Sequence, residues 1–310
     1  MVIVPLLTCI LLIIGVELLL RVVCQPDPLL KFIMRLVDIK SSQFELDDEM
    51  GYRPILGKGL KYSEEGIFGG QPTEKTPGKT RILFIGDSVT ARGKIIRALT
   101  SEYKENFLEV LNAGVEGFNV IQEVKFYRRY NKLVHPDIVV LTLHNNDLEF
   151  FPALYKAKNG SIFYYLYDQP TVTINPTFEK WSRLYQKYTA FRCFRLIQDG
   201  KMTNSLFRDT RLSLQSLNGE LVQSGAKMKV LLLPILAPLN DWTPSQIESR
   251  KQALQILNEL GIEYFDLLEP LVSALQTNTQ LTEKLGDTWH PNDVASGYFA
   301  RYLKARHFLN

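Results

Sequence analysis

Residues 81–88 read RILFIGDS. Four of the first five are apolar, and the glycine, acid and serine that follow form a turn from which a helix can begin. A continuous apolar run bounded by a turn signal is typical of a strand that is buried on both faces. The stretch therefore predicts a strand at residues 81–85 with Ser88 at its carboxyl end.

The same pattern of strand and helix continues to the end of the chain. Further strands are predicted at residues 108–111, 137–143, 229–233 and 264–268, and helices near residues 92–103, 120–133, 207–223, 245–260 and 292–306. Apolar strands that alternate with amphipathic helices indicate a parallel sheet covered on both faces. We therefore expect an α/β domain over residues 80–310.

The N-terminus is the strongest compositional outlier of the chain. Residues 1–16 carry no charge, Glu17 interrupts the apolar run, and three leucines precede Arg21. About 20 helical residues cross a bilayer core, so the run is long enough to span it. A signal peptide would have a basic start and a small-residue cleavage site, and neither is present. Residues 1–24 are therefore predicted to be an uncleaved transmembrane anchor, with a buried core helix as the alternative.

Two signals bear on the side of the membrane. Basic residues follow the span and none precedes it, which by the positive-inside rule places the main domain in the cytoplasm. Residues 29–39, LLKFIMRLVDI, have the pattern of a helix that lies on a membrane surface, where basic residues bind headgroups on either side. The sidedness stays open on these residues alone.

Two stretches fall outside the regular pattern. Residues 41–79 are rich in Gly, Pro and charge, so residues 25–79 are interpreted as a juxtamembrane helix and a connecting segment that wraps onto the domain. Residues 148–204 are rich in aromatics and begin directly after the third strand. This insertion is predicted to be either a lid over a pocket or a small subsidiary core.

Composition excludes several classes of protein. The 310 residues are 45% hydrophobic and carry a net charge of +3, and no basic stripe interleaved with aromatics indicates nucleic-acid binding. Three cysteines, Cys9, Cys24 and Cys193, offer neither a disulfide framework nor a C-x-x-C metal site. No G-x-G-x-x-G follows the first strand, which argues against a dinucleotide. No cofactor and no metal is expected.

Five residues are expected to meet at one edge of the sheet. Ser88, Gly117 and Asn146 follow the first, second and third strands, and ligands of an open parallel sheet bind at the carboxyl ends of its strands. The Ser88 N–H, the Gly117 N–H and the Asn146 amide would form an oxyanion hole. Asp287 and His290, three residues apart in the loop before the last helix, would orient and activate the serine.

These blocks resemble the SGNH, or GDSL-type, hydrolases. The family's four blocks are found in order as Gly86-Asp87-Ser88, Gly117, Asn146-Asp147 and Asp287-x-x-His290, over residues 81–310. The resemblance implies a three-layer α/β/α sandwich of flavodoxin-like type, with Ser88 as nucleophile, His290 as base and Asp287 as its partner. The apolar N-terminus is most similar to the membrane-anchored bacterial branch, which implies an extracytoplasmic catalytic domain against the charge bias.

Each block also has a structural interpretation. Ser88 could be a helix N-cap, Gly117 a plain turn glycine, and Asn146 part of a strand-ending turn. His290 could simply enter the last helix. His144 stands where the family usually has glycine, and its ring is expected to narrow the space beside the serine.

The leading functional hypothesis is a serine esterase or deacylase. It would cleave a carboxylic ester of a small molecule, lipid or glycan through an acyl-enzyme on Ser88. One alternative is an O-acyltransferase that hands the acyl group to a surface polysaccharide. A second alternative is a non-catalytic binding module on the same fold.

Overall fold

The computed structural model describes residues 3–23, 43–47, 49–70, 74–103, 107–148, 153–156, 162–166, 169–198, 201–277 and 280–309. Their contacts form two compact units, one of Met1–Arg53 with Phe151–Met202 and one of Pro54–Phe150 with Thr203–Asn310. The helix predicted at residues 29–39 lies outside the described residues. The domain limits at residues 25, 80, 148 and 204 stay predictions.

The second unit contains the predicted parallel sheet. Its five strands are β3 (Thr80–Ile85), β4 (Leu108–Asn112), β5 (Ile138–Leu143), β9 (Lys227–Leu232) and β10 (Glu263–Asp266). They are ordered β10-β9-β5-β3-β4 and every neighbouring pair is parallel, with Phe84 opposite Val140 in the two central strands. This order brings the ends of β3, β4 and β5 together at one edge of the sheet.

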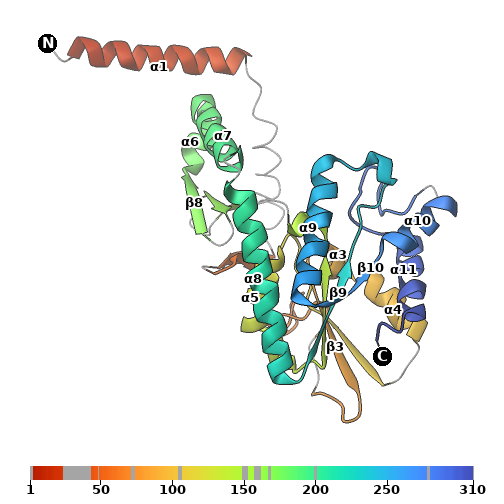
Figure 1. The fold of residues 1–310 in the computed structure, drawn as a ribbon. Coiled ribbons are helices and arrows are strands. Elements are labelled where there is room, and N and C mark those ends of the chain that lie inside the picture. The colour runs from red at the N-terminus through yellow and green to blue at the C-terminus, as the bar shows by residue number, and fades with distance from the viewer. Residues whose placement is uncertain are drawn as a thin grey trace. The chain divides into compact units, whose positions relative to one another are not determined.

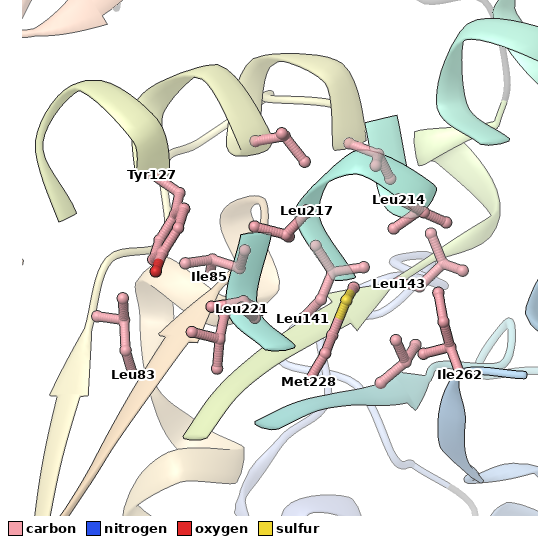
Figure 2. Packing of buried hydrophobic residues seen from close by; sticks show 14 of the residues in the cluster. Leu83, Ile85, Tyr127, Leu141, Leu143, Leu214, Leu217, Leu221, Met228 and Ile262 are labelled. Carbon is pink, nitrogen blue, oxygen red and sulfur yellow. The ribbon is translucent and has the colours of Figure 1, made fainter. Parts of the chain in front are cut away.

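Helices cover both faces of this sheet, so the predicted three-layer α/β/α sandwich is confirmed (Figure 1). One face carries α5 (Val120–Arg129), α8 (Lys201–Ser224) and α9 (Pro244–Leu260); the other carries α4 (Lys94–Tyr103), α10 (Leu268–Thr277) and α11 (Asp293–Ala305). Because successive strand residues point to opposite faces, Leu83 and Ile85 pack with the first set while Ile82 and Phe84 pack with the second. Figure 2 shows the first of these two cores.

Local signals set the ends of the helices. Asn119 begins α5 and Thr243 begins α9, each with a glutamine three residues on that completes a capping box. The helix predicted near residues 92–103 corresponds to α4, and the short helix α3 (Ser88–Arg92) precedes it. Gly93 separates them because it adopts a left-handed conformation (φ 67°) and donates its N–H to the Thr90 carbonyl.

The first unit holds the N-terminal helix, two small sheets and two helices. They are α1 (Ile3–Val23), the hairpin β1 (Phe44–Asp47) and β2 (Gly51–Pro54), the antiparallel sheet β6 (Ala153–Lys156), β7 (Ile162–Leu166) and β8 (Gln169–Ile174), and α6 (Pro176–Trp181) with α7 (Arg183–Gln198). The hairpin lies within the stretch that was interpreted as a connecting segment. Asp47 makes its turn by accepting the N–H groups of Glu49 and Met50. Whether the insertion acts as a lid stays a prediction.

Helix α1 fits the predicted anchor in length and composition. Val4–Val23 has a mean hydropathy of 2.6, enough to cross a membrane. Its apolar side chains are exposed, with Leu12 at 63% and Leu19 at 61%, so they do not pack into a core formed by the described residues. This exposure favours the predicted anchor over the alternative of a buried core helix.

Candidate active site

Ser88 is the first residue of α3, directly after β3. The N-cap of this helix is Asp87, whose carboxylate accepts the N–H of Val89 at 2.9 Å. The structural interpretation of Ser88 as the cap is therefore wrong, because its neighbour does that work. The Ser88 hydroxyl points instead to the loop near the C-terminus.

Gly86 lets the strand turn sharply into this helix. Its φ is 156°, and a Cβ placed on it would lie 2.0 Å from the Thr142 hydroxyl oxygen and 2.1 Å from that of Thr90. These two hydroxyls are hydrogen-bonded to each other and join α3 to β5. No side chain fits at this position, so the turn that presents Ser88 requires glycine.

Ser88, His290 and Asp287 form a connected chain of hydrogen bonds. The Ser88 Oγ lies 2.9 Å from His290 Nε2, and His290 Nδ1 lies 2.8 Å from Asp287 Oδ2. A carboxylate can only accept, so a neutral ring carries its proton on Nδ1 and leaves Nε2 to accept the serine proton. The structure brings these three predicted residues together, across 202 positions from Ser88 to His290.

The Asp287 carboxylate is held in its charged form. Burial opposes its ionisation, but the Trp289 N–H at 2.8 Å, the His290 ring and the His290 N–H together keep the pKa of this carboxyl below its ordinary value. Side-chain exposure is 15% for Asp287 and 16% for His290, so water screens the pair weakly. A charged Asp287 fixes the ring orientation and stabilises the imidazolium form of His290.

The loop that carries Asp287 and His290 is held both internally and by the segment after β9. Within the loop the Glu283 N–H donates to the His290 carbonyl, and the Leu236 N–H, after β9, donates to the Thr288 carbonyl. Asn292 then caps α11 by accepting the Ala295 N–H. His290 is therefore positioned by β9 and α11, and not by its own loop alone.

An ion pair joins the serine helix to the histidine loop. Arg92, the last residue of α3, contacts the Glu283 carboxylate, which also lies 3.6 Å from Lys94 Nζ. Exposed fractions of 35% for Arg92 and 18% for Glu283 make this a partly buried pair. The sequence did not reveal this pair, because two charged residues far apart in the chain form no local pattern.

The loop after β4 lies against the serine helix. The Asn112 side chain donates to the Thr90 carbonyl and accepts the Gly114 N–H, and the Val115 N–H donates to the Gly86 carbonyl. A Cβ on Gly114 would meet the Ala91 nitrogen at 2.3 Å, so this close approach requires glycine. Gly117, at φ 76° and exposed, ends the loop.

The loop after β5 is a short 3-10 turn, Asn145–Asp147, that contains Asn146. The side chain of Asn146 lies outside the described part of the structure, so its role in an oxyanion hole stays a prediction, as does that of the Gly117 N–H. Asp147 closes the turn by accepting the His144 N–H at 2.6 Å. The His144 ring is 1% exposed and packs against Trp289 with ring centroids 4.9 Å apart. It therefore contributes to packing beneath the site.

Three buried acids lie close together beneath this edge of the sheet. They are Asp87, Asp147 and Glu123 of α5, each at most 2% exposed. Burial first, and then the nearby charges of Asp147 and Asp87, raise the pKa of Glu123 well above its ordinary value. Burial and the Asp87 charge also raise the pKa of Asp147. Neither Glu123 oxygen has a hydrogen-bond partner among the described residues.

A hollow of about 900 Å³ borders the Asp287 side of the site. It is lined by the segment after β9, by α10 and by residues 280–282 and 285–288, with Leu285 94% exposed at its rim. Ser88 and His290 are not among its lining residues. The described residues also include no group of three or more His, Cys, Asp or Glu side chains that could hold a metal.

The chain is similar to several solved structures. It resembles Axe2, an acetylxylan esterase from Geobacillus stearothermophilus, with 16% identity and a TM-score of 0.47 over 75% of this chain and 97% of that one. It also resembles LAE5, an alpha/beta hydrolase enzyme from the metagenome of Lake Arreo, Spain, with 16% identity and a TM-score of 0.48 over 74% of this chain and 96% of that one. A third similar structure is the acetyl xylan esterase AlAXEase, with 13% identity and a TM-score of 0.47 over 73% of this chain and 99% of that one. No family model and no curated protein matches the sequence. Likeness at this level does not identify a function.

Proposed function

We propose that this chain is a membrane-anchored serine esterase of the SGNH type that cleaves a carboxylic ester. The observation that carries the proposal is the hydrogen-bonded chain from the Ser88 hydroxyl through both ring nitrogens of His290 to the Asp287 carboxylate. A serine alone is a weak nucleophile, and a base within hydrogen-bond reach that is itself oriented by an acid activates it.

The proposed reaction proceeds in two halves. In the first half, His290 Nε2 takes the Ser88 proton as Oγ attacks the ester carbonyl, and then gives this proton to the departing alkoxide. In the second half, His290 takes a proton from water as the water attacks the acyl carbonyl, and then gives this proton to the departing Ser88 Oγ, which releases the acid and regenerates free Ser88. The Ser88 N–H, the Gly117 N–H and the Asn146 amide are proposed to stabilise the oxyanion in both halves.

The substrate class is proposed from the chemistry of the site. A serine, a histidine and an acid catalyse acyl transfer, and we propose as acyl donor an ester, such as a small ester, a lipid or an O-acylated glycan. Helix α1 would keep the enzyme at a membrane, and the side of the membrane on which the catalytic domain lies stays open.

Covalent labelling tests the proposal directly. A fluorophosphonate probe should label the full-length protein in detergent, and Ser88→Ala should abolish the labelling. Ser101→Ala, which removes an exposed hydroxyl at the end of α4, is the matched control and should label like the wild type. Failure of the correctly folded wild type to react would overturn the proposal. An acyl group trapped on Ser88 in His290→Ala would name the acyl part of the substrate.

A further inference from the structure

Glu17 is the single acidic residue of the apolar helix α1, and its carboxylate binds the start of α7. It accepts the backbone N–H groups of Arg183 and Leu184 at 2.8 and 3.0 Å and the Ser182 hydroxyl at 2.9 Å. These are N–H groups of the first turn of a helix, which otherwise have no intrahelical partner. Glu17 thus caps α7 from a different helix, and Arg21, one turn further along α1, donates to it at 2.9 Å.

The depth of this contact follows from the position of Glu17 in the span. Glu17 precedes the last residue of the apolar helix by six positions, or ~9 Å at the α-helical rise of about 1.5 Å per residue. An ionisable side chain at such a depth is expensive unless it is paired, and here the pairing groups come from α7 and Arg21. The start of α7 is therefore held at the boundary between acyl chains and headgroups.

Helix α7 carries an exposed apolar stripe suited to this boundary. Leu184, Tyr188 and Phe191 are 37%, 52% and 58% exposed, and their spacing of four and three residues places them on one side of the helix. By the 3.6-residue repeat, Lys187 and Arg192 fall on opposite flanks of the stripe, and Arg195 follows on the same side, so the stripe is confined to the first half of α7. An apolar stripe with basic flanks is the pattern of a helix that lies in a membrane interface.

Helix α6 extends this surface with two more aromatic residues. Phe178 and Trp181 are 58% and 63% exposed, and the Trp181 carbonyl accepts from Arg21 of α1. An aromatic contact connects the two helices, because the ring centroids of Phe178 in α6 and Tyr185 in α7 lie 5.7 Å apart. Within α7, the Tyr185 ring centroid also lies 6.3 Å from that of Tyr188. Tryptophan and tyrosine are the residues enriched at the headgroup level of membranes.

We infer that α6 and α7 form a second membrane-contacting element, which lies in the bilayer interface and is fixed to the anchor by Glu17. The partner is a lipid surface, and the basic flanks favour anionic headgroups. Part of the aromatic insertion then binds lipid. The inference rests on α1 crossing the bilayer and is independent of the chemistry proposed for Ser88.

Fluorescence quenching in lipid tests the inference. The full-length protein and Trp181→Phe are reconstituted in vesicles of phosphatidylcholine and phosphatidylglycerol that contain lipids brominated near the carbonyl end or near the methyl end of the chains. The Trp181 signal is the difference between the two proteins. It should be quenched roughly two-fold more strongly by the shallow bromines than by the deep ones, as expected for an interfacial depth, and it should be shielded from iodide. A Trp181 signal that iodide quenches and bromines do not would overturn the inference.

A second variant tests the role of Glu17. Glu17→Leu makes the span more apolar, so carbonate should still fail to extract the protein, but the cap of α7 is lost. Iodide quenching of Trp181 should then increase. Ser182→Ala, which removes one of the hydrogen bonds to Glu17, is the matched control and should change it much less. An unchanged Trp181 signal in Glu17→Leu would show that Glu17 does not hold these helices. Fluorophosphonate labelling of Ser88 is measured in the same samples. Because labelling reports the proposed esterase site and Trp181 quenching reports membrane contact, failure of one proposal can be told from failure of the other.

Discussion

Arg92 and Glu283 form an ion pair between the two segments that carry the proposed catalytic residues. Arg92 ends the five-residue helix that begins with Ser88, and Glu283 lies in the loop that carries Asp287 and His290. The contact between the Ser88 Oγ and His290 Nε2 depends on the relative position of these two segments. We therefore expect the pair to position Ser88 and His290, the proposed nucleophile and base, without touching either of them.

We expect Glu283→Gln to lower kcat about tenfold, since small misplacements of reacting groups reduce the rate strongly. KM should change little, because neither residue of the pair is proposed to contact substrate. Hydrolysis of p-nitrophenyl acetate measures both constants. The control is Glu269→Gln, which removes the ion pair between Glu269 and Arg306, 3.1 Å apart. Because this pair is far more exposed than that of Arg92 and Glu283, its loss should leave kcat unchanged. Equal rates in wild type and Glu283→Gln would contradict the positioning role.

Asp287→Asn tests the orientation of the imidazole ring. An amide can present its NH₂ group to Nδ1, which favours the ring form with its proton on Nε2, and that nitrogen can no longer accept from Ser88. We expect kcat to fall roughly 10³- to 10⁴-fold, as it does for such a change in other triads. The amide oxygen can still accept the Trp289 N–H, so the fold should persist by circular dichroism. Asp293→Asn, an exposed acid at the start of α11, is the control.

The sheet and the three central residues could be predicted because their signals are local. Buried parallel strands are continuous apolar runs, and each proposed catalytic residue stands at a strand end or in the loop before the last helix. The break between α3 and α4 was not predicted, because nothing in the sequence shows that Gly93 adopts a positive φ. The sequence did not predict the tertiary contacts either. Arg92 and Glu283 are 191 positions apart, and Glu123 resembles any acid of an amphipathic helix until its burial is known.

Gly86→Ala should destabilise the protein by roughly 3 kcal/mol or more, because the added methyl group would overlap the hydroxyls of Thr90 and Thr142. The shift in the midpoint of urea unfolding measures this loss. Gly219→Ala is the matched control, since Gly219 lies in α8 and a Cβ added there would have nothing within 4 Å. That variant should instead gain about 0.5–1 kcal/mol from the helical preference of alanine. A stable and active Gly86→Ala protein would show that the turn can relax.

Glu123 should make the stability of the protein fall as the pH rises. Its pKa in the folded protein lies well above the ordinary value, because of burial and the charges of Asp147 and Asp87. Below the ordinary glutamate pKa both the folded and unfolded chains hold the proton. Above it, the unfolded chain releases the proton while the folded chain keeps it, so the free energy of unfolding decreases until the raised pKa is reached.

Glu123→Gln cannot ionise and should remove this decrease. Urea unfolding of the wild type and the variant at a series of pH values measures the two slopes. Glu259→Gln is a control, because Glu259 is expected to change the free energy of unfolding with pH in the opposite direction to Glu123. Hydrogen bonding from Gln255, and then the charge and hydrogen bond of Arg211, hold the pKa of Glu259 below its ordinary value, so this acid favours the folded state above the ordinary pKa. Removing it should lower stability at neutral pH relative to acid pH. Identical slopes in wild type and Glu123→Gln would mean that Glu123 is charged in the folded protein, and that a donor outside the described residues reaches its carboxylate.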